Sequence, residues 1–229
     1  MSAFFVTGSG TDVGKTFVAA GLIKHWRRCG RAVEALKPVA SGFDPASAAA
    51  SDPGVLLTAL GHSIAPEAIE HIAPWRFRAP LSPDMAAARE GRVIDFDALV
   101  GLSRRAIERA RDILLIEGVG GVMVPLDDEH TVLDWMCALR LPLVLVAGSY
   151  LGSISHTLTC LDVLRRRQLD VAALVVSESS GNTVPLQETV ATIARFTTAL
   201  PITAIPRLAP GAHEDAFASL ANLLRRSTE

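Results

Sequence analysis

The sequence predicts an α/β fold, in which a doubly wound and mostly parallel sheet is flanked by helices in a single domain of residues 1–229. Short apolar runs alternate with helical patterns along the chain, which is typical of strands joined by crossover helices. Several of these runs are nearly continuous Val, Ile and Leu, as expected for parallel strands that are covered on both faces. Glycine and polar residues follow most of the runs, where such sheets bind their ligands.

Six apolar runs are expected to form the strands of this sheet, because each is short and rich in residues that favour buried strands. They are Phe4–Thr7, Val33–Lys37, Ile113–Glu117, Leu143–Ala147, Val171–Val176 and Ile202–Ile205. Residues Gly121–Leu126 are expected to add a short strand after the third run.

Six segments carry apolar residues at helical spacing and are expected to form helices. Gly30 lies just past the first of them as a stop signal, and the last ends in basic residues that suit a helix C-terminus. They are Phe17–Arg28, Asp95–Arg111, Thr131–Arg140, Ser153–Arg167, Pro185–Thr198 and Glu214–Arg226. The small-residue run 45–51 is expected to be a mobile loop, and the proline-bearing segment 71–84 a long surface segment.

Composition excludes several classes of protein. The 22 basic and 24 acidic residues give a net charge of −2, so electrostatics do not favour nucleic acid as a partner. No apolar run approaches the ~20 residues of a membrane span, and the N-terminus lacks the pattern of a signal peptide. The scattered Cys29, Cys137 and Cys160 predict neither a zinc site nor a disulfide framework, and they favour a reducing cytoplasm.

A phosphate-binding loop is the strongest motif of the chain. Residues 3–16 run from an apolar segment through a glycine-bearing turn to Gly14-Lys15-Thr16 and a helical pattern. Backbone N–H groups of such a turn cradle phosphates, while Lys15 can reach the β- and γ-phosphates and the Thr16 hydroxyl can ligate Mg²⁺. Although Ser9 stands where the strict pattern has glycine, this arrangement favours a P-loop NTPase-like domain over a plain turn.

Two further strand ends carry candidate chemistry. Glu117 ends the third run and can hold Mg²⁺, although a tight turn with an exposed carboxylate is the alternative. Lys37 ends the second run and can stabilise a phosphoryl group, but a solvated lysine before a proline turn fits the pattern almost equally well.

Two other positions are ambiguous from the residues alone. Asp52 precedes Pro53, and this pair favours a helix N-cap over a metal ligand. The segment 148–155 leads into a helix, where either an anion site made of N–H groups or ordinary serine capping is expected.

Together these motifs resemble the dethiobiotin synthetases, enzymes that close the ureido ring in biotin synthesis, and the resemblance covers nearly the whole chain. It rests on Thr7-Gly8-x-x-Thr11-x-Val13-Gly14-Lys15-Thr16, Lys37-Pro38-Val39-Ala40-Ser41-Gly42 and Glu117-Gly118-x-Gly120-Gly121. Weaker support comes from Leu151-Gly152-x-Ile154-x-His156 and Ile205-Pro206-x-Leu208.

The resemblance implies a reaction in which 7,8-diaminopelargonic acid takes up CO₂ as a carbamate, ATP phosphorylates the carbamate, and the second amine closes the ring. It implies ATP as co-substrate and Mg²⁺ as cofactor, with Lys37 and Lys15 as catalytic residues beside the carbamate and the γ-phosphate. By the same resemblance, the metal is held or oriented by Thr16, Asp52 and Glu117.

The resemblance also implies binding residues and a homodimer with its sites at the subunit interface. Nucleotide contacts are implied for Asp12, Val13, Gly14, Lys15, Thr16, Phe17, Asp52, Glu117, Gly118, Val119, Gly120, Ser177, Glu178, Pro206, Arg207 and Leu208. Ser41 is implied to contact the diamine, and the partner subunit is implied to hold the distant carboxylate with its Gly152, Ser153, Ile154 and Ser155.

Two departures from the family pattern affect specificity. Ser177-Glu178 stands where relatives often have Asn-Asp, so ATP is expected to be less favoured over other triphosphates. The only tyrosine, Tyr150, lies outside the late helix from which some relatives supply a tyrosine to the substrate carboxylate, so backbone N–H groups are expected to bind that carboxylate.

Two other functions compete with ring closure. A regulatory, partitioning-type ATPase would share the P-loop, but such proteins usually carry a signature lysine where this chain has Gly10. An amidotransferase-type relative would need a glutaminase, for which no Cys-His pattern is visible. The segment 37–42 favours the ring-closing enzyme.

Overall fold

A parallel six-stranded sheet forms the centre of the computed structural model, which describes residues 1–182, 184–197, 199–207 and 213–226. The strand order is β2-β5-β1-β6-β7-β8, and each neighbouring pair is parallel. The strands are β1 (Ser2–Gly8), β2 (Val33–Leu36), β5 (Ile113–Glu117), β6 (Leu143–Ala147), β7 (Val171–Ser177) and β8 (Ile202–Ile205). All six expected strands are therefore confirmed, with ends that shift by at most two residues.

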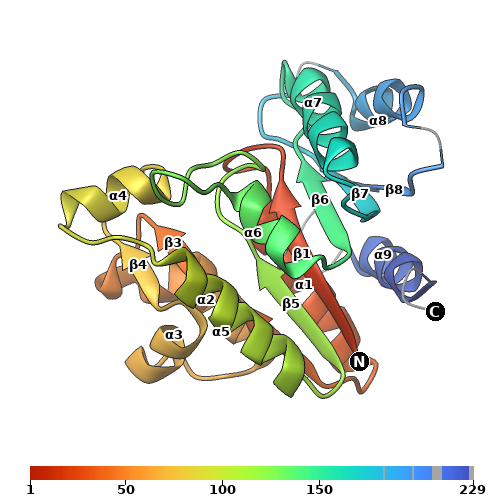
Figure 1. The fold of residues 1–229 in the computed structure, drawn as a ribbon. Helices are drawn as coiled ribbons and strands as arrows, with labels where there is room; N and C mark the ends of the chain where they lie inside the picture. The colour runs from red at the N-terminus through yellow and green to blue at the C-terminus, as the bar shows by residue number, and fades with distance from the viewer. Residues whose placement is uncertain (183, 198, 208–212, 227–229) are drawn as a thin grey trace.

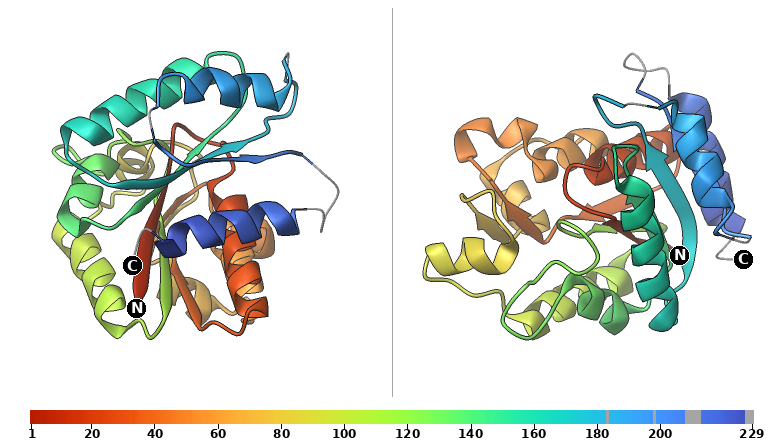
Figure 2. Two further views of the ribbon diagram at one scale, coloured as in Figure 1. Left: turned by 90° about the vertical axis from the view of Figure 1, so that its right-hand side faces the viewer. Right: turned by 90° about the horizontal axis from the view of Figure 1, so that it is seen from above.

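Helices cover both faces of this sheet, so the predicted doubly wound architecture is confirmed (Figures 1 and 2). One face carries α1 (Lys15–Arg28) and α9 (Glu214–Arg226), and the other carries α5 (Phe96–Arg109), α6 (Val132–Leu139) and α7 (Ser153–Arg166). The helix α8 (Leu186–Ala194) packs beside α7 and β8. Thr198, the expected end of α8, lies outside the described residues.

Three expectations about the connecting segments are wrong. Residues Gly121–Leu126 form turns instead of a strand, with one isolated bridge between Pro125 and Thr131. The Asp127 carboxylate accepts hydrogen bonds from the N–H groups of Glu129 and His130, which turns the chain back before a strand can extend.

The small-residue run is not a plain loop either. Residues Pro45–Ala50 form a 3₁₀ helix, which begins where the Asp44 carboxylate accepts a hydrogen bond from the N–H group of Ala46. The helix α2 (Asp52–Leu60) follows directly and packs against α1.

The proline-bearing segment 71–84 is partly buried and structured. It holds the end of α3 (Pro66–Ile72), the strand β4 (Trp75–Phe77) and the start of α4 (Pro83–Arg89). The strand β4 pairs in parallel with β3 (Val39–Ser41) as a small second sheet. Both strands have three residues, which is too short for an alternating pattern to show in the sequence.

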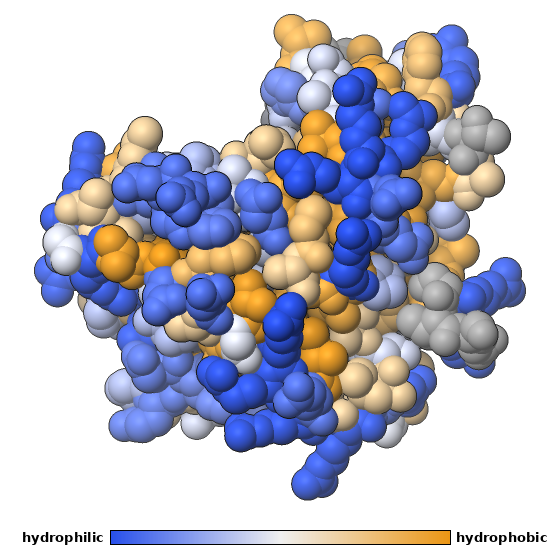
Figure 3. Space-filling model, in the orientation of Figure 1, coloured by the Kyte–Doolittle hydropathy of each residue, from blue (hydrophilic) through white to orange (hydrophobic). Residues whose placement is uncertain are grey.

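The core lies between the main sheet and its helices. Residues of β5 and β6 are fully buried, and the Phe5 ring meets the Trp135 ring edge-on at a centroid distance of 4.7 Å. On the face seen in Figure 3, hydrophobic side chains gather in the middle and hydrophilic ones along the lower edge. Within the described ranges, no helix is long and apolar enough to cross a membrane.

Candidate functional site

The phosphate-binding loop lies at the carboxyl edge of the sheet, between the end of β1 and the start of α1. Gly14 is the N-cap of α1 and has a φ of +95°, a backbone conformation that glycine adopts without strain. A Cβ placed there would lie 3.0 Å from Ser177 Oγ at the end of β7. Glycine at position 14 therefore serves both the turn and the close approach of the loop to the end of β7.

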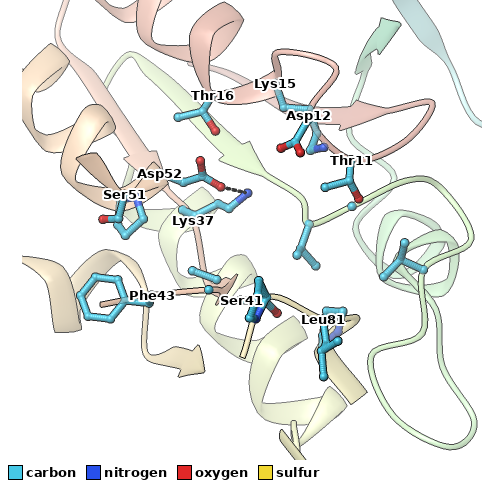
Figure 4. Close-up of a pocket in the computed structure, with 18 of the residues that line it drawn as sticks. Thr11, Asp12, Lys15, Thr16, Lys37, Ser41, Phe43, Ser51, Asp52 and Leu81 are labelled. Carbon is cyan, nitrogen blue, oxygen red and sulfur yellow. Dashed lines mark ion pairs between the residues drawn. The ribbon is translucent and has the colours of Figure 1, made fainter. Parts of the chain in front are cut away.

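A cluster of charged and polar side chains lies under this loop (Figure 4). Lys37 Nζ donates to Glu117 Oε1 and to the Gly118 carbonyl oxygen, both at 2.7 Å, and lies 3.1 Å from Asp52 Oδ2. The Thr16 hydroxyl donates to the same Glu117 oxygen at 2.6 Å. Lys37 is only 1% exposed, so the alternative of a solvated lysine is wrong.

Charge balance in this cluster sets the protonation of its members. Burial alone would lower the pKa of Lys37, but the carboxylates of Glu117 and Asp52 outweigh burial and raise this pKa above its ordinary value. Burial would raise the pKa of Asp52, but Lys37 and Thr16 lower it below its ordinary value. Lys37 is therefore a cation and Asp52 an anion at neutral pH.

Lys15 is also buried, and none of the described carboxylates is in hydrogen-bond contact with its ammonium group. Its Nζ donates to the Gly10 carbonyl oxygen at 2.9 Å. Burial and the nearby charge of Lys37 lower the pKa of Lys15 to about 8. The Lys15 ammonium is thus an incompletely compensated buried charge beside the loop that is expected to bind phosphates.

Asp52 does not cap the helix that it begins, so the interpretation favoured by the Asp-Pro pair is wrong. Ser51 is the N-cap of α2, and its hydroxyl accepts from the N–H group of Gly54 at 3.3 Å. Because Ser51 takes the capping role, the carboxylate of Asp52 is free to face Lys37.

The oxygen atoms of this cluster fit a divalent cation. The hydroxyl of Thr16 and the carboxylates of Asp52 and Glu117 are hard ligands of the kind that Mg²⁺ prefers. Glu117 Oε2 is buried and has no hydrogen-bond partner among the described residues, which leaves one acceptor in need of a ligand. In the described part of the chain, no three His, Cys, Asp or Glu side chains group as a ready-made metal site, so a cation here would also need water or phosphate oxygens.

Two cavities open on either side of the loop, and Asp12, Gly14 and Phe17 line both. The larger, of about 760 Å³, lies between the loop, Lys37 and the segment 80–83. The smaller, of about 410 Å³, lies between the loop and the ends of β7 and β8.

Most of the expected site residues meet at these cavities. The larger is lined by Asp12, Gly14, Lys15, Thr16, Phe17, Lys37, Ser41, Asp52, Val119 and Gly120. The smaller is lined by Asp12, Val13, Gly14, Phe17, Ser177, Glu178, Pro206 and Arg207. Glu117 and the carbonyl of Gly118 bind Lys37 directly. Leu208 lies outside the described residues.

The start of α7 lies apart from both cavities, because Gly152, Ser153, Ile154 and Ser155 line neither. Gly152 is the N-cap with a φ of +96° and has no side-chain cap, so the expectation of serine capping is wrong. Within a single chain, the structure therefore does not bring these residues to the phosphate loop.

Several cavity residues were missed by sequence reasoning. Phe43, Pro80, Leu81 and Val124 line the larger cavity, and His213 lines the smaller. Pro80 and Leu81 come from the segment 71–84, which was expected to be a surface segment, and Val124 comes from the expected strand Gly121–Leu126. No motif marked Phe43. His213 follows β8 and had no motif around it.

Comparisons with known proteins agree with this geometry. Residues 2–214 match a family model described as an AAA domain. The chain is 52% identical over 202 residues to the ATP-dependent dethiobiotin synthetase BioD of Acidiphilium cryptum, covering 88% of this chain and 91% of that one. It is 51% identical over 209 residues to the enzyme of the same name from Phenylobacterium zucineum, covering 90% and 89%.

Solved structures share the fold at low sequence identity. The cell division ATPase MinD of Pyrococcus furiosus superposes with a TM-score of 0.59 at 15% identity, covering 99% of this chain and 100% of that one. The MinD of Pyrococcus horikoshii in complex with Mg-ADP gives a TM-score of 0.62 at 14% identity, with 99% and 97% covered. These similarities support a P-loop NTPase-like fold.

Proposed function

This chain belongs to the ATP-dependent dethiobiotin synthetase family, and we propose that it closes the ureido ring of dethiobiotin from 7,8-diaminopelargonic acid, CO₂ and ATP. It is then an ATP-dependent cyclo-ligase of biotin biosynthesis. The observation that carries this proposal within the site is Lys37, a buried ammonium held between Glu117 and Asp52 beside the phosphate loop. Ring closure needs such a fixed positive charge, because both the carbamate and the transferred phosphoryl group are anions.

The reaction places two tasks on the site. The carbamate of one substrate amine attacks the γ-phosphorus of ATP, and ADP leaves. The second amine then attacks the carbamoyl carbon, and phosphate leaves as the ring closes. Since the substrates supply both nucleophiles, the protein has to position them and stabilise the developing negative charge.

We assign the two lysines to that charge. Lys15 Nζ contacts the Gly10 carbonyl, and phosphate oxygens would compete with this carbonyl for the ammonium group. Lys37 is held by three oxygen acceptors, which fix its Nζ, and we propose that the carbamate meets the γ-phosphate beside this ammonium group. When bound, Mg²⁺ would neutralise phosphate charge, held by the oxygens of Thr16, Asp52 and Glu117.

The larger cavity suits an aliphatic diamine. Apolar groups from Phe43, Leu81 and Val124 line it and can cover the methylene chain of the substrate. Ser41 Oγ is buried and has no hydrogen-bond partner in the part of the chain that the structure describes, and an amine or carbamate of the substrate would supply one.

The smaller cavity suits the nucleoside of ATP, since it adjoins the phosphate loop. Ser177 offers a single hydroxyl there, so ATP, CTP and GTP are expected to be used with similar kcat/KM. Steady-state rates with the three triphosphates test this prediction, and a strong preference for ATP would contradict it.

We further propose a homodimer in which the start of α7 of one subunit binds the substrate carboxylate in its neighbour. Gly152–Ser155 line neither cavity of their own chain, and Leu151 next to them is 91% exposed. Both features suit a segment that contacts a second subunit. Cys29, Cys137 and Cys160 are free thiols, which suits the cytoplasm.

The decisive experiment measures ADP release by the purified protein with MgATP. Release is expected only when the diamine and bicarbonate are both present, and dethiobiotin should form in equal amount. A regulatory ATPase would hydrolyse ATP regardless of either compound, and that result would overturn the proposed function.

A further inference from the structure

An aromatic cluster, formed by Phe17, His213 and Phe217, stands at the side of the smaller cavity. The Phe17 and His213 rings meet edge-on at a centroid distance of 5.2 Å, and the Phe17 and Phe217 rings at 5.7 Å. The His213 and Phe217 centroids are 6.3 Å apart. Phe17 and His213 both line the smaller cavity, whereas Phe217 is buried and lines, with the other two, a further cavity between α1 and α9.

The cluster is anchored on both sides. His213 Nε2 donates to the carbonyl oxygen of Pro206 at 2.9 Å, which joins it to the chain that follows β8. Phe217 belongs to α9 and packs against α1, where a Cβ at Gly21 would come within 2.0 Å of its ring. The helix α9 thus packs beside α1 (Figure 2), and the aromatic rings are fixed against the loop that begins α1.

Phe17 presents an exposed apolar surface in this setting. It directly follows Thr16 of the phosphate loop and remains 43% exposed although its neighbours in the cluster hold it in place. Covering an exposed aromatic ring with a flat apolar group removes apolar surface from water and therefore stabilises the complex. In a cavity that continues from a phosphate loop, the flat group of matching chemistry is a nucleobase.

We propose that Phe17 contacts the base of the bound nucleoside triphosphate and that His213 and Phe217 are positioning residues that hold the Phe17 ring. The inference rests on the proposed function and adds the means of base recognition. Stacking favours every nucleobase, because each has an aromatic face. The aromatic cluster therefore supplies affinity for any base, whereas Ser177 contributes little selectivity among bases.

The test compares two ligands that differ in the base. MgATP needs the whole site, whereas inorganic tripolyphosphate with Mg²⁺ occupies only the phosphate loop. Titration calorimetry should show that Phe17→Ala raises the Kd of MgATP by about tenfold, which corresponds to about 1.4 kcal/mol, and leaves tripolyphosphate binding unchanged. Phe17→Tyr should retain most of the affinity, since it keeps the ring.

Variants of His213 test the positioning role. His213→Ala should raise the KM for ATP with little change in kcat, as expected when binding is lost equally in the ground and transition states. His213→Gln keeps an N–H donor for the Pro206 carbonyl and should recover part of the loss. Phe196→Ala is the matched control, because Phe196 is 67% exposed and lines neither cavity.

Two results would overturn the inference. Equal weakening of MgATP and tripolyphosphate by Phe17→Ala would mean that the variant distorts the phosphate loop, and unchanged binding of both would mean that the ring does not contact the base. Failure of the unmodified protein to bind MgATP would overturn the proposed function and this inference together. Normal MgATP binding without diamine-dependent turnover would overturn the function alone.

Discussion

At the scale of single residues, burial decides what Lys37 can do. The sequence left a solvated lysine and a catalytic lysine almost equally open, because a strand end before a proline suits both. The structure buries its ammonium among two carboxylates and a carbonyl, where desolvation strengthens every electrostatic contact. Such a charge is already oriented before the phosphoryl group arrives.

Lys37→Ala is expected to lower kcat by about a hundredfold to a thousandfold, because a preorganised charge at the reacting group is lost. The variant should still fold, although removing one partner of a buried ion pair costs about 3–5 kcal/mol of unfolding free energy. Dethiobiotin formation and urea unfolding measure the two effects. Lys24→Ala, an exposed lysine on α1, is the control for both. Normal turnover by Lys37→Ala would exclude its assigned role.

Lys15 makes stability depend on pH. Because its pKa is lowered to about 8 in the folded protein from an ordinary 10.5, the folded state loses this proton first as pH rises. The unfolded state then binds more protons, so this group lets stability rise between about pH 8 and 10.5. Below that window the buried charge destabilises the fold.

Lys15→Met should therefore raise the unfolding free energy near neutral pH, by a value on the order of 2 kcal/mol, while it weakens ATP binding. The gain should shrink at about pH 10. Urea unfolding of the nucleotide-free protein at both pH values measures it, with the exposed Lys24→Met as control. A gain that stays constant with pH would contradict this origin.

At the scale of elements, long apolar patterns were predictable and short ones were not. Each of the six strands of the main sheet is hydrophobic enough to be predicted from its own residues. Their observed ends differ from the predicted ends by two residues at most. The strands β3 and β4, with three residues each, escaped because their pairing is a tertiary contact. The helix α4 begins in the segment 71–84, whose prolines were interpreted as signs of a surface segment, although Pro83 stands in the first turn of this helix. The Asp52-Pro53 pair did predict a helix start, and α2 begins there.

Contact between α1 and α9 depends on one glycine within a helix. Alanine is a better helix former than glycine by about 1 kcal/mol, so Gly21→Ala would stabilise an isolated helix. In the protein the added Cβ would overlap the buried Phe217 ring, and we expect a net loss of about 1–3 kcal/mol in unfolding free energy. Urea unfolding measures the change.

Gly101→Ala on α5 is the matched control for Gly21→Ala. A Cβ at Gly101 would lie 3.2 Å from the end of the Arg105 side chain, which can move aside. This variant should be neutral or more stable by up to about 1 kcal/mol. If Gly21→Ala behaved like Gly101→Ala, the packing of Phe217 on α1 would not hold.

At the scale of the whole molecule, the carboxyl edge of one sheet gathers the site. Residues 8–16, 37–42 and 117–121 are far apart in the chain, yet the strand order β2-β5-β1 makes their strands direct neighbours. Parallel pairing places all three carboxyl ends on one side. This topology explains why separate motifs with separate alternatives form one cluster of contacts.

The proposed dimer yields a prediction at the same scale. Leu151→Asp should leave the fold intact, because this side chain is 91% exposed, and should shift the protein from dimer to monomer in sedimentation experiments. Turnover should fall with dimer content if the partner's α7 segment completes the site. Val93→Asp, at a position 80% exposed, is the matched control and should change neither property. A Leu151→Asp variant that stays dimeric and active would contradict the proposed interface.

The sequence alone determined the α/β fold, the phosphate loop and the family resemblance, because these reside in local patterns of apolar residues, glycine and Gly-Lys-Thr. Only the tertiary structure decided that Lys37 is buried, that Ser51 rather than Asp52 caps α2, and that Phe17 meets His213. The physical reason is that burial and charge pairing depend on contacts between segments that are far apart in the sequence. A local stretch of sequence does not contain those contacts.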